Sequence, residues 1–203
     1  MNNKLFIIIS IFLVLTGGCT DKTVIHKRDT DYSSVEPHTL SGKEKNLLQL
    51  TTIEPSELLV YNVHLIKEHK VNVKVDYYKN KELKQTFINM TSSLKKGDSL
   101  ISAGFDNLPG DPQNKRIWFA AMGGAKGSTV ESMDINKGTA SSIISINDKK
   151  ELLHDKYTVI GVYIQNSFET DLHTVTLENE HSLDTILKEN ENVYMISFRI
   201  KGS

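Results

Sequence analysis

Apolar and polar residues alternate along much of the chain, with the period of two that is typical of β-strands. The alternation is clearest over residues 71–77 and 194–200, and it recurs over residues 61–65. In a half-buried strand, successive side chains point to opposite faces of the sheet. The pattern therefore predicts strands that turn one face toward a core and the other toward water.

Other segments extend this pattern of short strands. Further strands are predicted over residues 83–90, 99–103, 116–122, 157–164 and 172–177. Two of them, 116–122 and 157–164, are apolar on both faces, which predicts central strands. A tight turn is expected at Asn80–Lys81, because asparagine tolerates positive φ.

Helical patterns are short by comparison. Residues 183–188 and 148–154 each fit one or two turns, and Ser41 and Glu44 have the spacing of a capping box before two leucines. About eight or nine short strands predict an all-β fold, an immunoglobulin-like antiparallel β-sandwich with a flexible N-terminal tether. The alternative is an α+β domain in which a helix packs on one antiparallel sheet.

The first residues follow a different pattern. Lys4 precedes an apolar run over residues 5–15, and the small residues Gly17 and Gly18 lead into Cys19. The apolar run would span about 16 Å as a helix, against roughly 30 Å of membrane hydrocarbon. The segment resembles a bacterial lipoprotein signal peptide with its lipobox. The resemblance implies cleavage between Gly18 and Cys19 and attachment of lipid to the thiol of Cys19.

The resemblance implies a division of the chain into three parts. We expect a signal peptide over residues 1–18, a lipidated Cys19 with a disordered tether over 19–46, and the β-sandwich over 47–203. Cys19 is the only cysteine, so lipid attachment leaves no thiol for a disulfide. Two fatty acyl chains make a stable anchor, which predicts a protein held on the extracytoplasmic face of the cell membrane.

The charge balance limits the classes of partner that the chain is expected to bind. The chain has 24 basic and 25 acidic residues, for a formal net charge of −1. Nucleic-acid binding usually needs a strongly positive surface, so no nucleic acid is expected as a partner. The expected partners are the membrane, through Cys19, and an envelope protein, peptide or polymer.

Two segments interrupt the strand pattern and are predicted to be loops, residues 104–115 and 123–139. Loops on a rigid scaffold often carry binding residues, so a site within 104–139 is possible. Asp106 and Asp111 do not have the spacing of a calcium loop. In the glycine-rich stretch, Gly127 separates Lys126 from Ser128, which does not fit a phosphate loop.

No catalytic, metal-binding or cofactor-binding residue is assigned from the sequence. No two of the seven histidines have a metal-ligand spacing, and no nucleophile motif is present. Trp118 and Phe119 are expected in the core. The sequence predicts a non-catalytic binding or interaction module anchored to the membrane surface. The alternatives are a cell-envelope hydrolase with its site in 104–139 and a structural or sensory accessory of a membrane partner.

Overall fold

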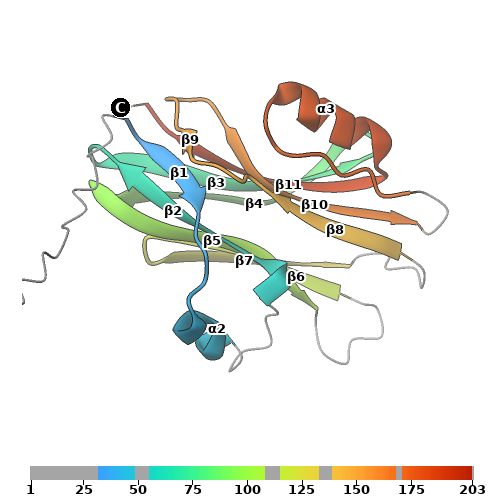
Figure 1. Ribbon diagram of the computed structural model, residues 1–203, viewed down its shortest axis with the longest axis horizontal. Helices are drawn as coiled ribbons and strands as arrows, with labels where there is room; N and C mark the ends of the chain where they lie inside the picture. The colour runs from blue at the N-terminus through green and yellow to red at the C-terminus, as the bar shows by residue number, and fades with distance from the viewer. Residues whose placement is uncertain (1–31, 49–54, 108–114, 133–138, 168–170, 203) are drawn as a thin grey trace, which may run out of the picture.

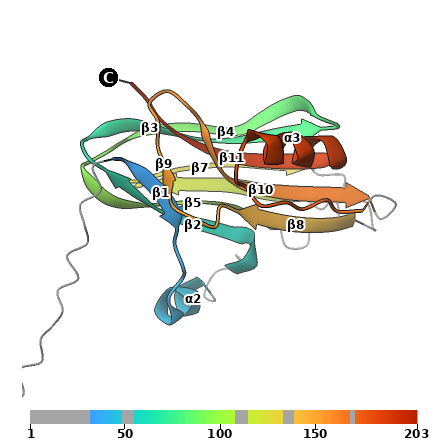
Figure 2. The same cartoon turned by 45° about the horizontal axis from the view of Figure 1, so that its top comes forward.

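Two antiparallel sheets pack face to face in a β-sandwich, as the computed structural model shows (Figures 1 and 2). The structure describes residues 32–48, 55–107, 115–132, 139–167 and 171–202. The predicted all-β sandwich is confirmed. It follows from the alternating strands, whose apolar faces can be buried only against a second apolar face.

Sheet A has six strands in the order β7-β6-β5-β2-β1-β9. Their bounds are β1 Ser34–Pro37, β2 Leu58–Leu65, β5 Gly97–Asn107, β6 Lys115–Met122, β7 Ala125–Ser132 and β9 Lys150–Glu151. Two short helical segments, α2 (Gly42–Leu48) and the 3-10 turn η1 (Pro55–Glu57), connect β1 to β2.

Sheet B has five strands in the order β4-β3-β11-β10-β8. Their bounds are β3 His69–Lys79, β4 Glu82–Leu94, β8 Thr139–Ser145, β10 Thr158–Ser167 and β11 Asn192–Ile200. Helix α3 (Glu180–Glu189) lies along β11 on the side of sheet B that faces away from sheet A (Figures 1 and 2). Its Ile186 is fully buried, so the helix covers part of that outer face.

Aromatic rings fill the space between the sheets. Trp118 of β6 is fully buried, and its ring stacks on Tyr194 of β11 with centroids 4.8 Å apart. Phe105 and Tyr163 pack beside them, with centroids 4.6 Å apart. Large buried rings supply much of a domain's apolar burial, and these rings come from both sheets. The expected core position of Trp118 is confirmed, whereas Phe119 is half-buried on the opposite face of β6.

A buried hydroxyl also joins the sheets. Tyr61 of β2 donates to the backbone carbonyl of Ile160 in β10, and its oxygen lies 3.0 Å from Oγ of Ser145 in β8. Burial raises the pKa of Tyr61 well above its usual value. Gly161 makes this approach possible, because an added Cβ would lie 2.3 Å from Leu59 and 3.0 Å from the Tyr61 oxygen.

Most predicted strands are confirmed, as are the helix over 183–188 and the Ser41–Glu44 helix start. The tight turn at Asn80–Lys81 is confirmed by positive φ at both residues, 49° and 71°. The predicted strand over 172–177 is wrong, because this segment has no regular structure. The predicted helix over 148–154 is also wrong, because β9 occupies part of it.

Three further predictions need correction. The loop predicted over 104–115 begins too early, because residues 104–107 belong to β5. Residues 123–139 are not one long loop: Gly123 and Gly124 form a turn with φ of 54° and 84°, and β7 follows at once. The disordered tether predicted over 19–46 is wrong for residues 34–37, which form β1 between β2 and β9. Polar, glycine-containing β7 and short β1 lack the alternation that identifies a strand from sequence, and pairing within the sheet supplies their stability instead.

Candidate functional site

Helix α2 begins with a capping box. The backbone N–H of Glu44 donates to Oγ of Ser41 at 3.3 Å, and the Ser41 N–H donates back to the Glu44 carboxylate at 2.7 Å. Nε2 of His38 lies 3.0 Å from the same carboxylate. The hydrogen bonds from Ser41, with the contact from His38, lower the pKa of Glu44 to about 2. These contacts fix where a helix of only seven residues starts.

The helix stands beside the outer face of sheet A, and a groove separates the two. This α2 groove has a volume of about 500 Å³. Its walls come from the segment before and within α2, from β2 and β5, and from the β6–β7 hairpin. They consist of Leu40, Glu44, Leu47, Leu48, Leu58, Val60, Leu100, Ile101, Ser102, Ala121, Met122, Gly123, Gly124, Ala125 and Lys126.

Leucines on opposite walls of the groove remain exposed. Leu47 of α2 is 56% exposed and Leu100 of β5 is 49% exposed. No residue of α2 is buried, so the helix does not close over the sheet. Scattered exposed leucines are common on proteins. Here, however, they line one concave surface, which is the arrangement expected of a site for an apolar ligand.

Few polar groups line the α2 groove. Within the part of the chain that the structure describes, Glu44 is its only carboxylate, and Ser41 and His38 already bind it. Lys126 is exposed at the rim, and Ser102 lies on β5. General acid–base catalysis needs a donor and an acceptor within reach of one substrate. This set of residues is suited to holding an apolar group, with Lys126 available to contact a polar end.

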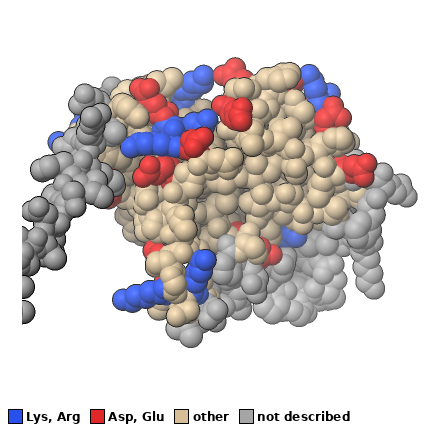
Figure 3. Space-filling view, viewed as in Figure 1, with Lys and Arg blue, Asp and Glu red and all other residues tan. Residues whose placement is uncertain are grey.

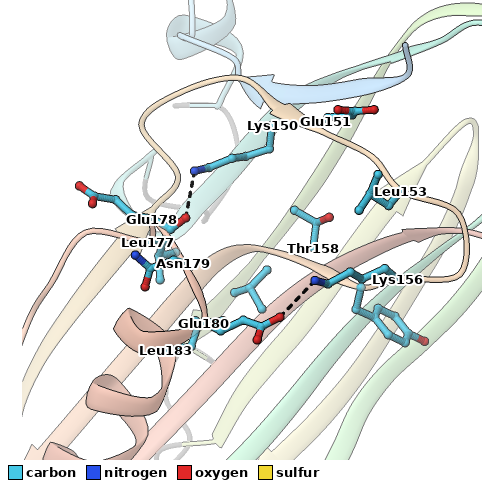
Figure 4. Close-up of a pocket in the computed structure, with 12 residues that line it drawn as sticks. Lys150, Glu151, Leu153, Lys156, Thr158, Leu177, Glu178, Asn179, Glu180 and Leu183 are labelled. Carbon is cyan, nitrogen blue, oxygen red and sulfur yellow. Dashed lines mark hydrogen bonds and ion pairs between the residues drawn. The ribbon is translucent and has the colours of Figure 1, made fainter.

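A second, smaller cavity lies at the start of α3 (Figure 4). This α3 cavity has a volume of about 240 Å³, and Leu153, Leu177 and Leu183 form apolar parts of its lining. Lysines reach across it at two points. Nζ of Lys150 donates to the Glu178 carbonyl at 3.3 Å, and Nζ of Lys156 lies 3.1 Å from the Glu180 carboxylate.

These contacts tie the start of α3 and the segment before it to β9 and the β9–β10 connection. Each of the two lysines binds an acceptor of the protein itself, and the charges of Lys156 and Glu180 offset one another. Asn179 caps α3 by accepting from the Ser182 N–H at 3.0 Å. The α3 cavity is therefore explained by the attachment of the helix, and the α2 groove is the stronger candidate for binding.

The structure brings part of the predicted 104–139 region into the α2 groove, namely residues 121–126. Asp106 lies at the end of β5, whereas Asp111 and Cys19 lie outside the described residues, as does the cleavage point after Gly18. Among the described residues, no group of three or more histidine, cysteine, aspartate or glutamate residues could hold a metal ion. No described helix is long and apolar enough to cross a membrane.

A family model for the YgaN domain matches residues 34–200. The chain belongs to the YgaN-domain family. The match begins at the first residue of β1 and ends at the last residue of β11, so the YgaN domain is the whole sandwich, with β1 and α2 included. No curated protein and no solved structure matches the chain significantly.

Sequence reasoning missed most of the groove because its walls are far apart along the chain. The capping box and the leucine pair after it were the only local signal for α2. Leu100 was visible only as part of a strand, with nothing to show that its side chain stays exposed. The YgaN domain brings these segments together by pairing β2 with β5 and β5 with β6.

Proposed function

We propose that this chain is a non-catalytic binding protein of the bacterial cell envelope, anchored to the membrane through lipid on Cys19. Its YgaN domain holds an apolar segment of a partner protein in the α2 groove. The observation that carries the proposal is the groove itself, about 500 Å³ in volume and lined mainly by aliphatic side chains. Volumes of this size are typical of ligand sites.

The exposed leucines give the groove its expected affinity. Leu47 and Leu100 are about half exposed, and a bound apolar segment would cover both. Full burial of one leucine is worth roughly 1.5–3 kcal/mol, so covering the two exposed halves contributes about 2 kcal/mol. A few such central contacts dominate the affinity of most protein interfaces. Lys126 at the rim would contact a carboxylate or carbonyl of the partner and so fix its direction.

The lipid anchor would determine where in the cell the protein is found. Lys4, the apolar run and the two glycines before Cys19 support a lipidated amino terminus. Such an anchor would keep the YgaN domain at the membrane surface, where envelope proteins are its neighbours. An accessory role beside one membrane protein is a specific form of this proposal.

The groove is tested first with a defined apolar probe, the dye 8-anilinonaphthalene-1-sulfonate. Leu100→Ala removes apolar contact from the groove wall, and we expect about fivefold weaker dye binding, which corresponds to roughly 1 kcal/mol. Leu83→Ala is the matched control, since Leu83 is 52% exposed on β4 of the other sheet. Equal dye binding by the two variants would contradict the proposal.

The partner is tested in cells. A photo-reactive amino acid replaces Leu47 or, as the control, Leu83 in the full chain. We expect a discrete cross-linked protein from position 47 that disappears when Ala121→Trp fills the groove. Cross-linking of the same proteins from both positions, or cross-linking that survives Ala121→Trp, would overturn the binding role.

The anchor has a separate test. Cys19→Ser should move the protein from the membrane fraction to the soluble fraction, because the thiol is the point of lipid attachment. Unchanged membrane partition of Cys19→Ser would refute the anchor without bearing on the groove.

A further inference from the structure

The two sheets have four edge strands, and three of them carry features that discourage pairing with another chain. Strand β9 has only two residues, both charged. Strand β4 has two register shifts in its pairing with β3 and carries Glu82 and Lys84 near its start. Strand β7 contains Lys126 and Gly127. Short length, bulges and charges are the usual means by which sheet edges avoid association.

Strand β8 has none of these features. Its seven residues, Thr139–Ser145, include no charged residue, no proline and no glycine. It pairs with β10 in unbroken register, from Gly161 opposite Ser145 to Ser167 opposite Thr139. A regular, uncharged edge presents every second N–H and C=O outward in the geometry of a sheet.

The outer side of β8 has no partner strand among the described residues, and Figures 1 and 2 show β8 at the edge of sheet B with no described element across it. Charges of both signs gather over β1, β9 and α3, whereas the surface over β8 and the neighbouring part of β10 is uncharged (Figure 3).

The strand is also held in place before any partner arrives. Ile143 and Ile144 are half-buried and pack against the core. Oγ of Ser145 lies 3.0 Å from the Tyr61 hydroxyl, which ties the end of β8 to sheet A. A strand that its own core contacts already hold in place loses little conformational entropy when another strand pairs with it.

We propose that β8 pairs antiparallel with β8 of a second copy of this chain, so that the two B sheets become one continuous sheet across a two-fold axis. With the axis at Ser142, Ala140 lies opposite the partner's Ile144, and Ser141 lies opposite the partner's Ile143. Each pair sets a small side chain against a branched one, which suits close packing across strands. A two-fold axis makes the same patch serve both copies.

The absence of charge argues for a second copy over a different protein. Partners that differ in sequence are commonly selected by complementary charge and by repulsion of wrong partners. Strand β8 offers no charge for such selection. An identical uncharged strand meets no repulsion and needs only the backbone hydrogen bonds that both copies already present.

Disulfide trapping tests the pairing in membranes that contain the full chain. Ser142→Cys places a thiol at the proposed axis, where directly opposite residues are close enough for a disulfide. Ser93→Cys is the matched control, since Ser93 is exposed on β4, the other edge of the same sheet. The chain with its native cysteine alone gives the background. We expect at least tenfold more covalent dimer from Ser142→Cys than from Ser93→Cys under mild oxidation.

A charge exchange provides the second test. Ser141 is exposed, so Ser141→Lys and Ser141→Glu should fold normally, which circular dichroism checks. Each variant, combined with Ser142→Cys, should lose the trapped dimer, and co-expression of the two should restore it as a mixed pair. Equal trapping at positions 142 and 93, trapping of the Ser142→Cys variant to a different protein, or failure of the mixed pair to form would overturn the proposal.

Discussion

Removal of the Tyr61 hydroxyl tests the contact between the sheets most directly. In Tyr61→Phe the ring stays, and the hydrogen bond to the Ile160 carbonyl is lost. That carbonyl keeps a second bond, from the Ile146 N–H at 3.1 Å. Ser145 Oγ likewise keeps the Ile146 carbonyl at 3.1 Å. Because no partner is left unsatisfied, the free energy of unfolding should fall by about 1 kcal/mol, the net value of an ordinary hydrogen bond.

The difference in stability between wild type and Tyr61→Phe should become smaller at high pH. Burial raises the pKa of Tyr61 in the folded protein, whereas the unfolded chain should ionise near pH 10. A group whose folded pKa is raised contributes its full stability below the unfolded pKa and loses it as pH rises toward the folded pKa. The loss is about 1.4 kcal/mol per pH unit. The wild-type advantage of about 1 kcal/mol at pH 8 should therefore fall to about zero near pH 11.

Urea unfolding from pH 8 to pH 11 measures this difference, with fluorescence of Trp118, the only tryptophan, as the signal. The chain is compared from Tyr32 onward as wild type and as Tyr61→Phe. Tyr32→Phe changes an exposed ring and should alter stability at pH 8 by less than about 0.5 kcal/mol. A Tyr61→Phe difference that stays constant up to pH 11 would refute the buried hydroxyl. A loss above about 3 kcal/mol at pH 8 would mean that its partners have no second bond.

Three further predictions concern the helices and one turn. Ile186→Ala should cost about 2–5 kcal/mol in urea unfolding, because the side chain is fully buried beneath α3; a loss below about 1 kcal/mol would contradict that packing. Ser41→Ala should raise the pKa of Glu44 from about 2 toward its usual value, which NMR titration measures. In wild type, the contribution of the capping box to stability should vanish as pH falls toward 2. An unchanged titration of Glu44 in Ser41→Ala would disprove the capping box. Gly123→Ala should lower the melting temperature, because φ is +54° and the added Cβ would lie 2.3 Å from Leu94, whereas Gly42→Ala, with nothing within 4 Å, serves as the control.

The strands with strict alternation were predictable because their pattern is local. Over 71–77 and 194–200, one face is apolar and the other polar, and no second segment is needed to recognise a strand. The turn at Asn80–Lys81 and the capping box at Ser41 were equally local, since a short-range hydrogen bond or a permitted φ decides each of them.

Strands β7 and β8 were not predictable in the same way. Neither alternates, because an edge strand packs fewer side chains and is held mainly by its ladder with a neighbour. Strand β7 pairs with β6 across the Gly123–Gly124 turn, and β8 pairs with β10, which lies further along the chain. Only the assembled sheet shows that residues 125–132 and 139–145 are strands.

The sequence by itself determined that the domain is built mainly of strands with one apolar face, and it predicted a β-sandwich with an α+β domain as the alternative. It also led to the prediction, still to be tested, of a lipid on Cys19. The tertiary structure decided where binding surfaces lie. The α2 groove needs the leucines of α2 and β5 beside the β6–β7 hairpin, and the β8 edge exists only because nothing described pairs beyond it. Both depend on which segments become neighbours, and that is set by sheet order rather than by any local run of residues.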